Sequence, residues 1–388
     1  MLFRFSRRTC LLIAGLMLLL LLGGCVIASD PTSTPTSTPV VSTPVATTTQ
    51  PATQPTTVAP ATTVPVTTAP TEPTTEPTVP TTAPTEPTTV PPEPTTEPTE
   101  PTTVPPEPTT EPTEPSTEPT QPQLQAQHAF VYDTRTEEFR YINCGLYETI
   151  YPASVTKLFT TYVALQYLDA DAYITVGDEL DMVAWDASSA GLRKGDRLTV
   201  EALAQCTLLV SGCDASYTLA AAAGRAMLGD PNASTAIAIQ TFMTEVNQRG
   251  ALLGMICTWF SSPDGYHKED HHISPQAFVI IAKCCMEDAR IAKIAGTYRA
   301  TISIQSETGR VRSKVLKNSN EMLNPDNADF YCANALGLKT GYTSAAGACL
   351  LSTIGVDGGY LIVGVFGCPD YESRYVDVYA LLQWLEVT

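Results

Sequence analysis

The sequence predicts a mixed α/β (α+β) domain in its C-terminal two-thirds, and three observations support this. Apolar runs at 349–354 and 360–366 are joined through Asp357-Gly358, a dipeptide typical of a β-hairpin. Apolar residues at helical spacing follow Pro152, where a helix can begin. The same spacing returns at 371–385, near the end of the chain. These features favour a sheet covered by helices.

The other elements follow in chain order. Two short strands are predicted at 128–132 and 139–142, on either side of a polar turn. A glycine-containing polar loop at 187–198 leads to Thr199, which we expect to cap a helix that runs to 210. Asp214 is expected to cap an alanine-rich helix that runs to 227. Lys339 is placed on or beside a strand that precedes the hairpin.

The first 25 residues are typical of a targeting segment. Arg4, Arg7 and Arg8 precede an apolar run at 11–22 that is too short for a comfortable membrane span. The run ends Leu-Gly-Gly-Cys at Cys25, which resembles the lipobox of bacterial lipoproteins. This resemblance implies lipidation at Cys25 and attachment to the membrane through an N-terminal lipid. The expected location is extracytoplasmic, at the outer face of the cytoplasmic membrane in the cell-wall zone. An ordinary signal peptide and an uncleaved anchor are the alternatives.

Residues 26–125 read as a disordered Thr/Pro/Glu-rich linker. Of the 32 prolines in the chain, 26 lie between Pro31 and Pro122, a segment without Lys or Arg. A 14-residue unit at 87–100 is repeated at 101–114. Because aliphatic residues are scarce and proline fixes φ, we expect an extended segment without a core. It acts either as a passive spacer or as a tether that lets the following domain search a thick wall layer.

Residues 126–388 form the predicted domain and are mildly acidic. They contain 19 basic and 29 acidic residues, which argues against nucleic acid as a partner. Their nine cysteines cannot all pair internally, and no C-x-x-C repeat indicates zinc. We expect mostly buried thiols, with room for a bridge whose partners the sequence does not identify.

The stretch after Tyr151 contains an S-x-x-K motif, Ser154 to Lys157. On a helix these two residues lie on one face, about one turn apart. A serine hydroxyl is a poor nucleophile until a base takes its proton, and a neutral lysine is such a base. A helix N-terminus also directs backbone N–H groups toward a developing oxyanion. The motif therefore indicates nucleophilic catalysis.

Two further motifs follow. Ser211-Gly212-Cys213 lies between two predicted helices, where we expect Ser211 to point into a cleft. Lys339-Thr340-Gly341 lies on the strand before the hairpin, and Gly341 is expected to let a peptide substrate approach the backbone.

With S-V-T-K, S-G-C and K-T-G in this order, the domain resembles the serine-type D-alanyl-D-alanine carboxypeptidases, the low-molecular-weight penicillin-binding proteins. Similar segments at 191–203, 253–267 and 337–347 extend the resemblance over nearly all of 126–388. The resemblance implies a β-lactamase/transpeptidase-like fold, with an antiparallel sheet packed by helices plus an all-helical lobe. It implies hydrolysis of peptidoglycan pentapeptide stems through an acyl-enzyme, β-lactams as covalent inhibitors, and no metal or other cofactor.

The resemblance also implies roles for single residues. Ser154 would be the nucleophile, Lys157 its general base, and Ser211 the group that passes a proton to the leaving D-alanine. Lys339 and Thr340 would hold the terminal carboxylate of the substrate, since a cation pairs with a carboxylate.

The remaining implied roles fall on the backbone and on one unusual residue. The N–H groups of Ser154 and Tyr342 would form the oxyanion hole, with Gly341 beside the substrate. Cys213 stands where the family usually has asparagine, and a thiol is a weak hydrogen-bond donor and acceptor. This departure puts catalytic efficiency and the balance between hydrolysis and transfer in doubt.

Three alternatives remain. The first is a β-lactamase of the same catalytic design, for which Glu245-Val246-Asn247 is the nearest match to the expected E-x-x-L-N stretch. The second is a penicillin-binding surface protein impaired by Cys213. The third is a metal site formed by His267, His271 and His272, against which we favour a polar loop because H-E-x-x-H is absent.

Overall fold

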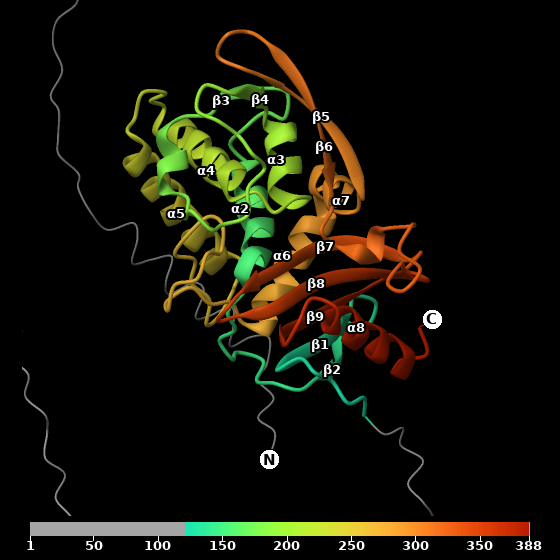
Figure 1. The fold of residues 1–388 in the computed structure, drawn as a ribbon. Coiled ribbons are helices and arrows are strands. Elements are labelled where there is room, and N and C mark those ends of the chain that lie inside the picture. Colours follow the sequence, from blue (N-terminus) through green and yellow to red (C-terminus); the bar gives the residue numbers. More distant parts are fainter. Residues whose placement is uncertain (1–120, 388) are drawn as a thin grey trace, which may run out of the picture. The chain divides into compact units, whose positions relative to one another are not determined.

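The computed structural model describes residues 121–387. The predicted signal, Cys25 and most of the predicted linker lie outside the described residues. A five-stranded antiparallel sheet in the order β2-β1-β9-β8-β7 carries helices on both faces (Figure 1). Its strands are β1 (His128–Asp133), β2 (Glu138–Ile142), β7 (Ala335–Thr343), β8 (Gly347–Val356) and β9 (Gly359–Cys368).

The predicted strands and the hairpin are confirmed. Val356 pairs with Gly359 across the β8–β9 turn, and Gly358 takes a φ of +81° that glycine adopts at little cost. β1 pairs with β9 over six residues, which joins the first and last strands of the domain at the centre of the sheet.

Each face of the sheet is covered by different helices. α8 (Ser373–Trp384) packs Val378, Leu381 and Leu382 against one face. α2 (Thr156–Ala164) and α6 (Pro275–Glu287) share a core with the other face, where Phe278 stacks on Phe366 with ring centroids 4.3 Å apart. The apolar spacing at 371–385 therefore predicts the terminal helix correctly.

The second lobe is mainly helical, as expected, and also carries a small sheet in the order β3-β4-β5-β6. The strands β3 and β4 are three residues long and β6 shows no clear apolar alternation, whereas β5 alternates Ala300, Ile302 and Ile304 with exposed polar residues, a signal that the sequence analysis did not use. The remaining elements of the domain are η1 (Ala153–Val155), β3 (Tyr173–Thr175), η2 (Asp178–Met182), β4 (Arg197–Thr199), α3 (Val200–Leu208), α4 (Cys213–Leu228), α5 (Thr235–Leu252), α7 (Ala289–Ala295), β5 (Arg299–Gln305), β6 (Val311–Lys317) and η3 (Glu321–Leu323).

The helix caps at the start of α3 and α4 test two sequence predictions. Thr199 caps α3 by accepting from the N–H of Ala202, as predicted. The prediction that Asp214 caps α4 is wrong, because Gly212 is the N-cap residue and Asp214 lies within the first turn. Its carboxylate instead accepts from the N–H groups of Ala190 and Leu192 at 2.8 and 2.9 Å. Asp214 therefore fixes the loop before α3 rather than the helix end.

The nine cysteines after residue 121 are free thiols, six of them buried. This agrees with the expectation of small apolar core residues, and the described part of the chain contains no bridge. Among the described residues, no helix is both long enough and apolar enough to cross a bilayer.

Candidate active site

The turn that carries Ser154 lies where the sheet meets the helices. Pro152 precedes the short 3₁₀ turn η1, which continues directly into α2. Lys157, in the first turn of α2, is fully buried, and its Nζ lies 2.8 Å from Ser154 Oγ. The same Nζ donates to the carbonyl oxygen of Asp264 at 2.7 Å. The S-x-x-K motif thus places an amine in direct contact with the serine hydroxyl.

Two glycines clamp this turn. A Cβ on Gly265 would lie 1.9 Å from the carbonyl oxygen of Ala153, and one on Gly341 would lie 3.0 Å from the backbone nitrogen of Ser154. Gly341 was expected to make room for a substrate, but its open side faces the nucleophile turn. Strand β7 can lie against Ser154 because this position has no side chain.

Ser211 and Cys213 lie at the junction of α3 and α4, as the sequence predicts. Ser211 is half-buried with a φ of +59°, an uncommon left-handed conformation for a residue with a side chain. Its carbonyl accepts from Ser188 Oγ at 2.6 Å, which holds the turn in place. Cys213 Sγ lies 3.6 Å from Ser188 Oγ, and burial raises the pKa of its thiol, so Cys213 stays protonated at neutral pH.

Strand β7 supplies the opposite wall. Lys339 is fully buried and donates to the carbonyl of Thr340 at 2.9 Å. Burial, together with the nearby Lys157 and Arg374, holds the pKa of Lys339 well below its usual value. A bound anion would offset both effects, which suits this amine to a carboxylate. The side chain of Tyr342, two residues after Thr340, is about half exposed.

Arg374 and Ser319 belong to the site, and the sequence analysis missed both. Arg374 on α8 is buried, stacks over Tyr371 and Tyr375, and has an Nε without a hydrogen-bond partner. No carboxylate pairs with it among residues 121–387. Ser319 Oγ lies 2.6 Å from Thr340 Oγ1. The sequence could have indicated Arg374, because it lies four residues before Val378 on the buried side of an amphipathic helix, where an arginine is unusual. No sequence pattern indicates Ser319.

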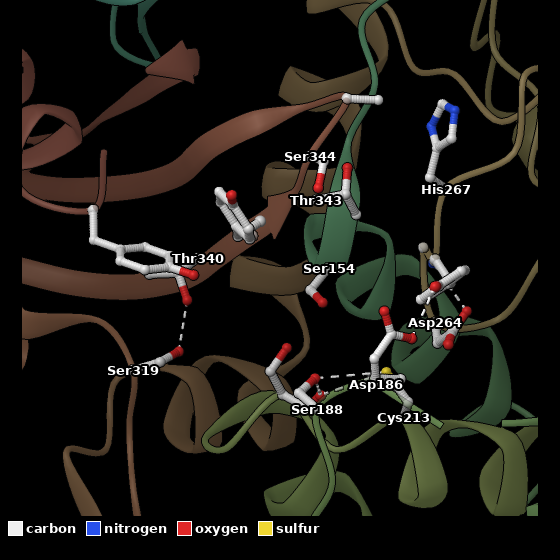
Figure 2. A pocket seen from close by; sticks show the side chains of 18 of the residues that line it. Ser154, Asp186, Ser188, Cys213, Asp264, His267, Ser319, Thr340, Thr343 and Ser344 are labelled. Atoms are coloured by element: carbon white, nitrogen blue, oxygen red, sulfur yellow. Dashed lines mark hydrogen bonds between the residues drawn. The ribbon is translucent and has the colours of Figure 1, made fainter. Parts of the chain in front are cut away.

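These side chains meet in one cavity of about 690 Å³. Ser154, Ser211, Cys213, Thr340, Gly341 and Tyr342 line it, and Figure 2 labels Ser154, Cys213 and Thr340 among them. Lys157 and Lys339 contact this lining from behind, Lys157 at Ser154 Oγ and Lys339 at the carbonyl of Thr340. The structure therefore brings together all eight candidate residues of the domain. Glu245, the nearest match to a β-lactamase carboxylate, is elsewhere on α5 and pairs with Arg249 at 2.8 Å.

The histidine-rich loop after α5 supports the nucleophile turn from below. His271 is 2% exposed, its Nε2 lies 2.9 Å from Thr156 Oγ1, and its Nδ1 accepts from the N–H of Ser261. Burial lowers the pKa of His271 to about 4, so it is neutral at pH 7. The loop also contributes Asp264, His267 and Tyr266 to the cavity. Within the described chain no three His, Cys, Asp or Glu residues are grouped to hold a metal ion.

The family profile of the D-alanyl-D-alanine carboxypeptidases matches residues 115–370. The chain belongs to this family. The match covers all three motifs, and with it the family, the fold class and the serine-type carboxypeptidase activity inferred from the sequence are confirmed.

Individual relatives of this carboxypeptidase family agree. The chain is 28% identical to the D-alanyl-D-alanine carboxypeptidase of Streptomyces sp. strain K15 over 60% of its own length and 77% of that protein. It is 26% identical to DacF of Bacillus subtilis strain 168, over 67% of its own length and 62% of DacF. The crystal structure of the Streptomyces K15 DD-transpeptidase superposes with a TM-score of 0.62 and 27% identity, covering 69% of this chain and all of that one.

Proposed function

We propose that Ser154 is the nucleophile of a D-Ala-D-Ala carboxypeptidase and that Lys157 is its general base. The 2.8 Å contact between the two side chains is the observation that carries this proposal. In the proposed reaction Ser154 Oγ attacks the carbonyl between the two D-alanines, and its proton passes to Lys157. The C–N bond then breaks, D-alanine leaves with a proton delivered through Ser211, and water hydrolyses the ester.

The other cavity residues have supporting roles in this proposal. The backbone N–H groups of Ser154 and Tyr342 stabilise the oxyanion, and Gly341 keeps the two close together. Lys339, Thr340 and Ser319 bind the substrate carboxylate. Arg374 joins them at the same wall as a buried guanidinium whose Nη2 donates to the Tyr375 hydroxyl and whose Nε has no hydrogen-bond partner among the described residues. A charge-assisted pair of this kind is stronger than a neutral hydrogen bond.

The proposed substrates are peptidoglycan pentapeptide stems, with β-lactams as covalent inhibitors at Ser154. An amine that replaces water as acceptor would give transfer instead of hydrolysis. Solved forms of the Streptomyces K15 transpeptidase include one with a cysteine changed to asparagine and one with a serine two positions earlier changed to alanine. Ser211 and Cys213 have the same spacing, which favours a site that works with a cysteine.

Mass spectrometry after incubation with penicillin tests the proposal. We expect an adduct of one penicillin on the peptide that contains Ser154, together with D-alanine release from an acyl-D-Ala-D-Ala peptide. Ser154→Ala should lose both signals, whereas Ser313→Ala on the exposed face of β6 should keep them. An adduct on another residue contradicts the proposal. Rapid release of ring-opened penicillin would favour a β-lactamase. A stable adduct without D-alanine release would favour a penicillin-binding protein with impaired catalysis.

We also propose that the chain is held outside the cytoplasmic membrane by lipid on Cys25. The support is the Leu-Gly-Gly-Cys sequence after the apolar run, together with membership of a family that acts on the cell wall. Cys25→Ser should release the protein from membranes or block its processing. Unchanged mass and membrane retention would contradict the lipid anchor and leave the catalytic proposal standing.

A further inference from the structure

The two ends of the active-site cavity differ in charge. Figure 2 shows Thr340 and Ser319 to one side of Ser154, and Asp186, Asp264 and His267 to the other. Arg374, which is linked to Ser319 through the hydroxyl of Tyr375, is the one lysine or arginine among the described residues that line the cavity. The first end therefore attracts an anion and the second end offers carboxylates.

This asymmetry fixes the direction of a bound peptide, on the assumption that the proposed function is correct. The terminal carboxylate belongs at the end with Thr340 and Ser319, and the scissile carbonyl belongs at Ser154. The rest of the peptide must then leave through the end with Asp186. At about 3.4 Å per extended residue, the side chain of the residue before D-Ala-D-Ala falls in that part of the cavity.

Among the described residues, the carboxylate of Asp186 has a free oxygen with which to bind a cation at this end of the cavity. The phenol of Tyr266 donates to Asp186 Oδ1 at 2.9 Å, which ties two separate loops together across the cavity. The second oxygen of Asp186 has no side-chain partner in the described chain, and no lysine or arginine pairs with this carboxylate. The hydrogen bond raises the pKa of Tyr266, so the phenol keeps its proton and remains a donor.

The Asp264 carboxylate adds to the negative charge of this end. It is 1% exposed, its Oδ1 accepts from the N–H of Tyr266 at 3.0 Å, and its Oδ2 has no hydrogen-bond partner. Tyr266 is therefore held at its backbone by one carboxylate while it holds the other with its hydroxyl. The hydrogen bond from Tyr266 therefore positions the exposed carboxylate of Asp186 as an acceptor.

We infer that Asp186, positioned by Tyr266, selects peptides in which the residue before D-Ala-D-Ala is a diamino acid with a free side-chain ammonium group. The carboxylate binds the ammonium, and the ring of Tyr266 packs on the methylene chain. Asp186 is thus a specificity-determining residue of the carboxypeptidase reaction.

Two tripeptides that differ only in charge test this inference on the full chain. Nα-acetyl-L-Lys-D-Ala-D-Ala carries the free ammonium, and its Nα,Nε-diacetyl counterpart does not. Because exposed ion pairs are weak and charge-assisted hydrogen bonds stronger, we expect kcat/KM for the charged peptide to be about threefold to thirtyfold higher. Asp186→Asn should bring this ratio close to one, mainly through the charged peptide, and Tyr266→Phe should lower it partly.

The matched control is Asp171→Asn, which removes an exposed aspartate of the same lobe outside the cavity lining and should leave the ratio unchanged. A wild-type ratio near one, or an unchanged ratio in Asp186→Asn, overturns the inference while D-alanine release upholds the proposed function. If neither peptide releases D-alanine and penicillin forms no adduct, the proposed function fails and the inference fails with it.

Discussion

The two walls of the active-site cavity are built by different means. On the helical wall, Ser154 and Ser211 lie in tight turns in which Ala153 and Ser211 itself adopt left-handed φ values of +47° and +59°. On the sheet wall, Lys339 and Thr340 lie on β7, which pairs with β8 residue by residue from Gly337 to Thr343, after an irregularity between Ala335 and Gly337. The two serines are thus placed by strained turns, and Lys339 and Thr340 by the regularly paired part of a strand. Four substitutions test this division of labour.

Lys157→Met should have the largest effect, because it removes the proposed general base from the helical wall. Loss of general base catalysis costs about 10²–10⁴-fold, so penicillin acylation and D-alanine release should fall together by that factor. Lys293→Met, at an exposed lysine of α7, is the control and should retain full activity. If Lys157→Met is acylated at nearly the wild-type rate, another residue is the base.

Arg374→Gln tests the sheet wall and should act mainly on binding. A hydrogen bond to a charged group is worth about 1.5–3 kcal/mol, so kcat/KM for a peptide with a free C-terminal carboxylate should fall about tenfold to a hundredfold. A peptide whose terminal carboxyl is amidated should react equally slowly with both proteins. An equal loss for both peptides would mean that Arg374 only supports the fold of α8.

His271→Gln should change how the free energy of unfolding depends on pH, because the buried imidazole of His271 behind the helical wall has a lowered pKa. Its pKa is near 6.5 in the unfolded chain and about 4 in the folded protein. The unfolded state therefore takes up a proton first as the pH falls below 6.5, and this costs the wild type about 3 kcal/mol of unfolding free energy by pH 4.

The variant should lose less unfolding free energy over this range, as measured by urea denaturation. His272→Gln, which changes the neighbouring histidine, should lose as much as the wild type. Parallel curves for wild type and His271→Gln would show that His271 does not set this dependence.

Cys213→Asn should have the smallest effect and the opposite sign. An amide in place of the thiol adds a good donor and acceptor to the cavity, next to the proposed position of the substrate peptide group, so D-alanine release should rise by about tenfold. Cys206→Ala is a comparison at a buried thiol of α3 that does not line the cavity, and it should not raise activity. An equal or lower rate in Cys213→Asn would indicate that the site is adapted to cysteine.

The sequence predicts the regular parts of this molecule well. The hairpin at Asp357-Gly358, the terminal helix and the cap at Thr199 depend on local patterns, and all three are confirmed. The small sheet β3-β4-β5-β6 was missed because β4 and β5, which pair with each other, lie more than 100 residues apart, and because β3 and β4 are only three residues long. Asp214 was misassigned because Gly212, two residues earlier, is the capping residue, so that the carboxylate of Asp214 binds the N–H groups of a distant loop instead.

In the candidate site, too, the sequence predicts the residues of local motifs and misses those that tertiary packing brings in. Ser154, Lys157, Ser211 and Lys339 come from short motifs, which the sequence displays directly. Arg374, Ser319 and Asp186 reach the cavity only through tertiary packing, from α8, from the segment after β6 and from the loop after η2. No local pattern connects them, so only the folded chain identifies them.

The contact of Gly265 and Gly341 with the Ser154 turn limits how this protein can evolve. Even the smallest side chain at either position would reach 3.0 Å or less from the backbone of residues 153–154. Substitutions that adapt the protein to a new antibiotic are therefore expected at the rim of the cavity, because the two positions beside Ser154 cannot accept a side chain.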